Sequence, residues 1–325
     1  MYRALGLISG GLDSSLAAMT LMRQGIEVTG IAFVTPFFHA EKAKAAAKGI
    51  GHRLIIENMS DVHLQIVKTP KYGYGRNMNP CIDCHALMFQ LAGERMVKDS
   101  FDFLFSGEVL GQRPMSQNAN ALKSVANLSG FADRVLRPLS AKLLPTTAME
   151  EAGRVDREQL HGFQGRSRKP QQALAKEWGL HDYPASGGGC LLTEEGFSNQ
   201  LRDLFDHNSE ATVADIELLK VGRQFRLSAT AKLILGRHRS DNEAMQQQIK
   251  PEQIKLRSQN FSGPLGLFCG DSEQQELDIA AAIVASYGKG KDETEVEVLC
   301  ITGEHEFVRR VKPMPRELSR QLLIR

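Results

Sequence analysis

The sequence predicts an α/β protein with a doubly wound parallel sheet, followed by a smaller α+β domain. Short apolar runs alternate with amphipathic helical patterns through roughly the first 140 residues. A glycine-rich turn joins the first apolar run to the first helical pattern, and the alternation is lost beyond residue 208. Strands that alternate with helices pair in parallel through right-handed crossovers, so this order predicts a sheet with helices on both faces.

Composition indicates an ordinary globular protein. The 325 residues suffice for two or three domains. The net charge of +2 says nothing by itself about nucleic acid, so a basic surface has to be sought locally in the sequence. No apolar run approaches the ~18 residues of a membrane span, and the residues after Met1 do not form a signal peptide. We therefore expect a cytoplasmic protein with no membrane partner.

The first element expected is a buried strand over residues 4–8, followed by a Ser-Gly-Gly turn and a helix over residues 12–24. Glycines let the backbone approach a phosphate, and the first N–H groups of the helix point at it. Asp13 fits this site only if Mg²⁺ lies between carboxylate and phosphate. The residues expected at this nucleotide site are Ser9, Gly10, Gly11, Asp13, Ser14 and Ser15.

The alternation continues along the chain. Further strands are predicted over residues 27–33, 53–57, 101–105 and 135–138, and helices over residues 40–48, 61–67, 86–97, 119–128, 171–178 and 197–205. Gly107 directly follows one of these strands. In open α/β sheets the ends of such strands line the ligand crevice, so we expect Gly107 beside the glycine turn.

Three of the five cysteines lie in unusual settings. Cys81 and Cys84 follow a long Pro/Gly/Asn-rich loop and begin a helix, and Cys190 ends a glycine run. Their spacing leaves four interpretations open: a zinc site, a 4Fe–4S cluster with an open iron, a persulfide relay, or no role. Cys269 and Cys300 lie in apolar strand-like runs and are expected in the core.

The residues Ser-Gly-Gly-Leu-Asp-Ser at positions 9–14 resemble the PP-loop of the N-type ATP pyrophosphatases. They do not form a Walker motif, because no Lys-Ser/Thr follows the glycines at the required spacing. The resemblance implies that ATP and Mg²⁺ bind here and that the substrate is adenylated at the α-phosphorus. It also implies that the end of the second strand, at Phe33, faces the adenosine.

A second resemblance involves Asn-Pro-Cys-Ile-Asp-Cys-His at residues 79–85 and Gly-Gly-Cys at residues 188–190, which look like the tRNA 2-thiouridylases. Cys84 and Cys190 match that family's two cysteines. Cys81 is an addition, similar to the cluster-dependent tRNA thiolases. The resemblance implies catalytic roles for Asp13, Cys84 and Cys190, with Cys81, Cys84 and Cys190 as ligands of a 4Fe–4S cluster. The implied partners are tRNA and a sulfur donor, either inorganic sulfide or a persulfide carrier protein.

A domain boundary is expected near residue 208, which gives a PP-loop domain over 1–208 and an α+β domain over 209–325. Residues from about 140 to 208 would form a cysteine-bearing extension toward tRNA. Between residues 218 and 257, nine Lys/Arg stand against three acids. In that stretch Gly236-Arg237 and Asn242 resemble the Gly-Arg-x-x-x-x-Asn signature of the NFACT RNA-binding domain. The arginines expected to contact RNA are Arg113, Arg166, Arg168, Arg237 and Arg239.

These observations predict an ATP-dependent tRNA sulfurtransferase. It would adenylate a carbonyl oxygen of a tRNA base and then replace that oxygen with sulfur. Two other functions are open. One is a PP-loop enzyme that acts on a small molecule, for which the three cysteines and the basic segment would be superfluous. The other is a non-catalytic RNA-binding protein with a nucleotide site, which would not convert ATP to AMP.

Overall fold

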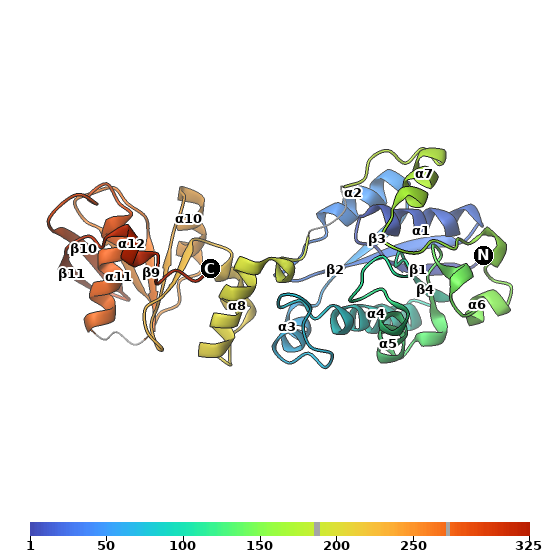
Figure 1. Cartoon of the computed structure of the whole chain (residues 1–325), viewed down its shortest axis with the longest axis horizontal. Coiled ribbons are helices and arrows are strands. Elements are labelled where there is room, and N and C mark those ends of the chain that lie inside the picture. Colours follow the sequence, from blue (N-terminus) through green and yellow to red (C-terminus); the bar gives the residue numbers. More distant parts are fainter. Residues whose placement is uncertain (185–188, 271–273) are drawn as a thin grey trace. The chain divides into compact units, whose positions relative to one another are not determined.

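The chain divides into two units, residues 1–193 and residues 194–325. The computed structural model describes residues 1–184, 189–270 and 274–325 (Figure 1). The expected boundary at residue 208 lies one helix further along the chain. That helix, α8 (Glu195–His207), belongs to the second unit because its Asp203 forms an ion pair with Arg226 at 2.8 Å.

A parallel five-stranded sheet forms the centre of the described part of the first unit. Its order is β3-β2-β1-β4-β5, and the strands are β1 (Arg3–Leu7), β2 (Glu27–Val34), β3 (Arg53–Asn58), β4 (Phe103–Ser106) and β5 (Val135–Leu136). The chain moves outward from β1 to β3 and then returns to the other side of β1 at β4. The predicted doubly wound sheet is confirmed, and β1 and β4 border its switch point.

Helices cover both faces of this sheet (Figure 1). One face carries α1 (Leu12–Arg23), α2 (Glu41–Ile50) and α7 (Lys169–Glu177), and the other carries α3 (Ser60–Lys68), α4 (Cys81–Lys98) and α5 (Ala119–Ser129). Each face has its own apolar core. Short turns complete the unit: η1 (Ala132–Arg134), η2 (Ala141–Leu143), α6 (Ala148–Glu151), η3 (Arg157–Gln159) and η4 (Leu191–Thr193).

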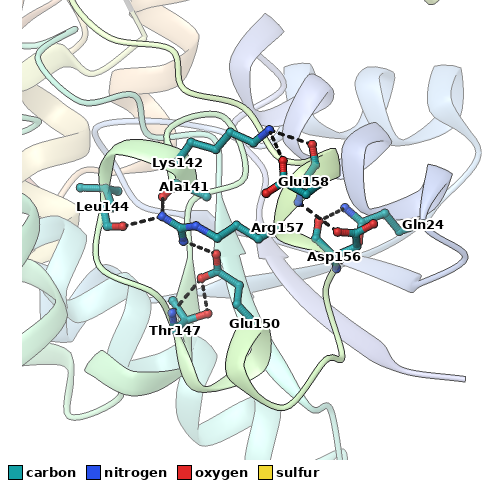
Figure 2. A network of polar contacts seen from close by, with 9 residues as sticks. All are labelled: Gln24, Ala141, Lys142, Leu144, Thr147, Glu150, Asp156, Arg157 and Glu158. Atoms are coloured by element: carbon teal, nitrogen blue, oxygen red, sulfur yellow. Dashed lines mark hydrogen bonds and ion pairs between the residues drawn. The ribbon is translucent and has the colours of Figure 1, made fainter.

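The segment after β5 is held by polar contacts centred on Arg157 (Figure 2). The Arg157 guanidinium donates to the carbonyl oxygens of Ala141 at 2.7 Å and Leu144 at 3.0 Å. It also forms an ion pair with Glu150. The other oxygen of the Glu150 carboxylate accepts from the backbone N–H and the hydroxyl of Thr147, both at 2.8 Å, and so caps α6. Arg157 thus holds the two short turns η2 and α6 together.

The same segment is attached to α1. The Gln24 amide donates to the carbonyl of Asp156 at 3.2 Å, and the N–H of Asp156 donates back to Gln24 at 2.9 Å (Figure 2). Lys142 reaches the carbonyl of Glu158 at 2.8 Å. The connection from β5 to α7 is therefore tied to the helix that follows the glycine turn.

The second unit is α+β, as the sequence predicts. Its described residues form an antiparallel six-stranded sheet in the order β11-β10-β8-β9-β7-β6. The strands are β6 (Arg223–Arg226), β7 (Lys232–Leu235), β8 (Ile254–Ser258), β9 (Gly266–Cys269), β10 (Val296–Thr302) and β11 (His305–Val311). The helices are α8, α9 (Val213–Leu219), α10 (Arg239–Gln247), α11 (Gln274–Ser286) and α12 (Arg316–Ser319).

Several of these elements, including β8, β11, α10 and α12, are absent from the sequence prediction. In β8, charged residues alternate with apolar ones and one face of the strand is buried, whereas in β11 only Val311 is buried. The α10 segment RSDNEAMQQ buries only Asp241 and Met245. Such weak apolar patterns acquire their structure from the sheet on which they pack. Within the described ranges, no helix is long and apolar enough to cross a membrane.

Candidate functional site

The glycine turn after β1 is shaped by close backbone contacts. Gly10 has φ +78°, and a Cβ atom there would lie 2.2 Å from the carbonyl carbon of Lys42. Gly11 caps α1 in an extended conformation without a side-chain hydrogen bond. The Ser14 hydroxyl donates to the Gly11 carbonyl at 2.9 Å and lies 3.3 Å from the Ser9 hydroxyl. The first N–H groups of α1 and these hydroxyls thus surround one small concave backbone turn, a suitable arrangement for an anion.

Asp13, in the first turn of α1, has one occupied and one open carboxylate oxygen. Oδ2 accepts from the Gln112 amide at 2.8 Å and from Arg168 at 3.4 Å. Oδ1 is buried and has no hydrogen-bond partner among the described residues. Gln171 in turn donates to Gln112 at 2.9 Å. A buried carboxylate oxygen without a donor fits a hard divalent cation such as Mg²⁺.

Gly107 lies against the start of α1, as expected from its place after β4. A Cβ atom at Gly107 would lie 2.4 Å from the backbone nitrogen of Ser14. The residue after β4 therefore packs directly against the backbone at the start of α1, with no room for a side chain between them. Of the other predicted nucleotide contacts, Ser15 and Phe33 are buried, with 2% and 5% of their surfaces exposed.

A buried ionic network connects β4 to α4. Glu108 accepts from Arg137 Nε at 2.9 Å and lies 2.9 Å from His85 Nδ1. Burial alone would raise the pKa of Glu108, but the Arg137 guanidinium and His85 overcome this and lower it to about 2. The charged network fixes the first turn of α4 at the carboxyl edge of the sheet. This is the edge to which the glycine turn also belongs.

The three predicted cysteines come together in the first unit. Cys81 is the first residue of α4, and its sulfur accepts from the Asn79 amide at 3.1 Å. Cys84, one turn further along, is buried. Burial raises the pKa of the Cys84 thiol well above its usual range, and its neighbours Cys190, Cys81 and Asp83 raise it further. Cys84 is therefore a neutral thiol close to two other sulfurs.

The segment that carries Cys190 is anchored to loops at this edge. The N–H of Leu191 donates to the Phe37 carbonyl, which follows β2, at 3.0 Å. The Thr193 hydroxyl donates to the Cys190 carbonyl at 2.7 Å, and Asn77 donates to the Thr193 carbonyl at 2.6 Å. Of the predicted Gly-Gly-Cys at residues 188–190, Gly188 lies outside the described residues, whereas Gly189 and Cys190 are described.

His63 is a residue of this site that the sequence analysis does not identify. It lies on the buried face of α3, and its Nε2 is 3.2 Å from Cys84 Sγ. Its ring centroid is 5.6 Å from that of Phe37 and 5.6 Å from that of Phe38. Burial lowers the pKa of His63 to about 4, so the imidazole is neutral. The one signal in the sequence is a histidine in phase with Leu64 and Val67 on an apolar helix face.

The cysteines do not form a ready metal site. All three lie in the described part of the chain, where no group of three or more His, Cys, Asp or Glu side chains is placed to hold a metal ion. A 4Fe–4S cluster requires three thiolates around one centre, and a metal that binds a thiol also removes its proton. The residue types of Cys81, Cys84 and Cys190 therefore suit either a cluster or a persulfide relay, and the cluster stays a prediction.

The five predicted RNA contacts differ in their surroundings. Arg113 and Arg166 are exposed. Arg168 turns inward, and its guanidinium lies 3.4 Å from Asp13 Oδ2. In the second unit, Arg237 forms an ion pair with Asp241 at 2.7 Å, whereas Arg239 is 93% exposed and pairs with an exposed Glu243.

The NFACT-like signature has a structural explanation. Gly236 lies so close to Asn242 that a Cβ atom would be 1.9 Å from the Asn242 side-chain oxygen. That oxygen accepts from the N–H of Leu265 at 3.2 Å. Glycine and asparagine therefore fix the connection from β7 to α10. This connection also carries Arg237 and Arg239.

The parallel sheet with the glycine turn at its switch point gives the first unit a PP-loop ATPase-like α/β fold. The family model described as Thiamine biosynthesis protein (ThiI) matches residues 2–142. The model described as NFACT protein RNA binding domain matches residues 222–322. The chain is thus similar to a PP-loop family in its first unit and to an RNA-binding domain in its second.

Curated relatives match the first unit. A tRNA-specific 2-thiouridylase of Treponema denticola is 32% identical over 114 residues, which cover 31% of this chain and 31% of the relative. A probable tRNA sulfurtransferase of Ureaplasma urealyticum is 33% identical over 150 residues, 42% of this chain and 36% of the relative. The chain spans about a third of the length of the relatives that it matches.

Two solved structures are also similar. A 4-thiouridine synthetase in complex with RNA and ATP has 21% identity and a TM-score of 0.39, over 55% of this chain and 41% of that chain. The C-terminal part of a fibronectin/fibrinogen-binding protein from Streptococcus suis has 10% identity and a TM-score of 0.30, over 75% of this chain and 96% of that one. Scores of this size carry no argument about function.

Proposed function

We propose that the chain is an ATP-dependent tRNA sulfurtransferase that converts a carbonyl of a tRNA base into a thiocarbonyl. The observation that carries the proposal is the gathering of three cysteines at the edge of the sheet that also carries the PP-loop. Cys84 has Cys81 and Cys190 as neighbours, and His85 of the same helix turn reaches Glu108 at the end of β4. Sulfur chemistry and adenylation chemistry therefore belong to one site.

The first step would be adenylation. ATP would place its pyrophosphate on the N–H groups after Gly10, with Mg²⁺ at the open oxygen of Asp13. The base oxygen attacks the α-phosphorus, a new P–O bond forms, and pyrophosphate leaves. Magnesium would supply charge neutralisation on the leaving pyrophosphate. Arg168, held at Asp13, lies where it would contact the phosphates rather than the RNA.

The second step would replace the activated oxygen with sulfur. We assign the sulfur to a persulfide on Cys190, which is less buried than Cys84 and so easier for a donor to reach. Its outer sulfur attacks the base carbon, the C–O bond breaks, and AMP leaves. Cys84 then attacks the inner sulfur, forms a disulfide with Cys190 and releases the thiolated base. The thiol proton of Cys84 passes to the departing sulfur, and His63 Nε2, 3.2 Å from Cys84 Sγ, is placed to orient the thiol for this attack.

The resemblance to cluster-dependent thiolases offers a different sulfur carrier, a 4Fe–4S cluster on Cys81, Cys84 and Cys190. The steps above are written for the persulfide, and none of them passes through a cluster. In the persulfide route Cys81 is dispensable, while in the cluster route it is a ligand. The two routes therefore differ in what the loss of Cys81 does.

The test uses protein purified without oxygen and supplied with ATP, tRNA and either sulfide or a persulfide donor. Thionucleosides are measured by mass spectrometry, and AMP, iron and acid-labile sulfide are quantified. We expect one AMP per thionucleoside, an activity that is lost in Cys84→Ser and Cys190→Ser, and a Cys81→Ala variant that stays active. Cys300→Ala, at a cysteine of the second unit that lies in its apolar core, is the matched control.

Two outcomes would contradict parts of the proposal. About four irons per chain, lost in Cys81→Ala together with activity, would replace the persulfide route with the cluster. Binding of tRNA and ATP without any AMP or thionucleoside would reject sulfur transfer altogether. The chain would then be an RNA-binding protein with a nucleotide site.

A further inference from the structure

A cavity of about 360 Å³ opens in the second unit, far along the sequence from Cys81, Cys84 and Cys190. It is bordered by α8, α9 and the strands β6, β7 and β9. One part of its wall is apolar and consists of Leu204, Leu218, Leu219 and Ile234. Cavities of this size and character are typical of sites for small organic ligands.

Lys232 lines this cavity, although it lies in β7, which is paired with a strand on each side. It is the first residue of β7, and only 9% of its side chain is exposed. Its Nζ lies 4.0 Å from Asp203 Oδ2, which is beyond hydrogen-bonding distance. Burial lowers the pKa of Lys232 to about 8, although Asp203 opposes this. A buried ammonium held so loosely is costly unless a ligand completes its surroundings.

The carboxylates near Lys232 are already used by other cations. Asp203 accepts two hydrogen bonds from Arg226, at 3.0 and 2.8 Å. Asp215 accepts from Lys250 at 2.7 Å. Among the described residues that form these pairs, three cations therefore face two carboxylates, and Lys232 is the cation in excess. The cavity is consequently suited to an anion.

The Cys269 thiol, which shares the cavity, does not supply that anion. Burial raises the pKa of Cys269 to about 11, although Lys232 opposes the change. The Gln253 amide donates to its sulfur at 3.2 Å. At neutral pH this cysteine is a neutral thiol, and the charge of Lys232 stays uncompensated.

We propose that this cavity binds a nucleoside phosphate, with the phosphate on Lys232 and the base against the apolar wall. A ligand of that class carries its negative charge on one group and presents a flat, largely apolar base. Its size suits a cavity of about 360 Å³. The ligand is either a free nucleotide or the phosphorylated end of an RNA strand. The match of residues 222–322 to an RNA-binding domain makes the RNA end relevant. The proposal does not depend on sulfur transfer.

The test measures how fast an amine-acetylating reagent modifies Lys232 in the full wild-type chain at pH 8, followed by peptide mass spectrometry. The probes are AMP, an RNA oligonucleotide with a 5′-phosphate, and the same RNA without it. A ligand present at ten times its dissociation constant should slow the labelling of Lys232 about tenfold. The exposed Lys291 in the same unit is the internal control and should react at an unchanged rate.

The probes separate the two sources of the phosphate. Protection by AMP supports a free nucleotide, and protection by the phosphorylated RNA alone supports an RNA end. Unchanged labelling with all three probes overturns the proposal. As a second measurement, Lys232→Met, which keeps the length of the side chain and removes its charge, should lose binding of the protecting probe, whereas Lys291→Met should keep it.

Discussion

Two aspartates occupy equivalent local positions in the two units, each in the first turn of a helix that follows a glycine-containing motif. Asp241 of α10 is saturated: its carboxylate accepts from the N–H groups of Gly222 at 3.2 Å and Arg237 at 3.0 Å and from the Arg237 guanidinium at 2.7 Å. Asp13 of α1 keeps one buried oxygen without a partner in the described structure. The same residue in the same local setting is structural in one unit and open to a ligand in the other.

The difference lies in what the rest of the fold brings to each carboxylate. At Asp241, the hydrogen-bond donors come from the motif itself and from the turn before β6. These bonds attach the start of α10 to the antiparallel sheet. At Asp13, the neighbours come from remote segments that leave one oxygen open. A short glycine-containing motif therefore marks the start of a helix in both units. A buried carboxylate oxygen without a hydrogen-bond partner distinguishes the helix start that is open to a ligand.

The largest effect is expected from Asp13→Asn. Loss of the charge that would hold Mg²⁺ should reduce tRNA-dependent pyrophosphate release by about a hundredfold or more. The melting temperature should fall only slightly, because the amide oxygen of Asn can still accept from Gln112 and only the 3.4 Å ion pair with Arg168 is lost. Asp61→Asn, an exposed acid in the first turn of α3, is the control and should stay active. An active Asp13→Asn enzyme would place the metal elsewhere.

Gly107→Ala tests whether the approach of β4 to the PP-loop is required. The new Cβ would lie 2.4 Å from the Ser14 nitrogen, so the start of α1 has to move. We expect a loss of about 1–3 kcal/mol in the free energy of unfolding and a weaker affinity for ATP, measured by denaturation and calorimetry. Gly49→Ala on α2, where a Cβ meets nothing within 4 Å, should be neutral or slightly stabilising. Equal behaviour of the two variants would show that the contact is unimportant.

Asp241→Asn tests the structural role of the saturated aspartate. The Arg237 side chain lowers the pKa of Asp241 from 3.8 to about 2. A lowered folded-state pKa adds stability that is fully present above pH 3.8 and is lost as the pH falls toward 2. The variant should therefore be less stable than wild type by about 1–2 kcal/mol at pH 7. The difference should shrink between pH 4 and pH 2, and a constant difference would contradict the assignment.

The smallest effect is expected from Arg239→Ala. Its side chain is 93% exposed and its ion pair with Glu243 is solvated, so its loss should not change stability. If it contacts an RNA phosphate, the affinity for tRNA should fall a few-fold. The slope of log affinity against log salt concentration should also decrease by about one, because one counterion fewer is released on binding. Arg134→Ala, an exposed arginine outside residues 222–322, is the control. An unchanged salt slope would remove Arg239 from the RNA interface.

The fold class was predictable because it depends on local periodicity. The strands of the first unit are apolar runs bounded by turns, and the observed β2 (Glu27–Val34) differs from its prediction by one residue. In contrast, β11 (His305–Val311) buries only Val311 and is a strand because β10 pairs with it. Its pattern contains too little apolar signal for the sequence to reveal it.

The sequence by itself determined the doubly wound sheet, the PP-loop and the three cysteines of interest, because glycine turns, serine hydroxyls and thiols carry their chemistry in the residue type. Only the tertiary structure decided that His63 lies at Cys84, that Arg168 turns to Asp13 and that Lys232 is a buried cation in a cavity. These relations join segments distant in the chain, such as residues 13 and 168. Local propensity is silent about such pairs, because packing of the helices on the sheets sets which groups meet and which remain without a partner.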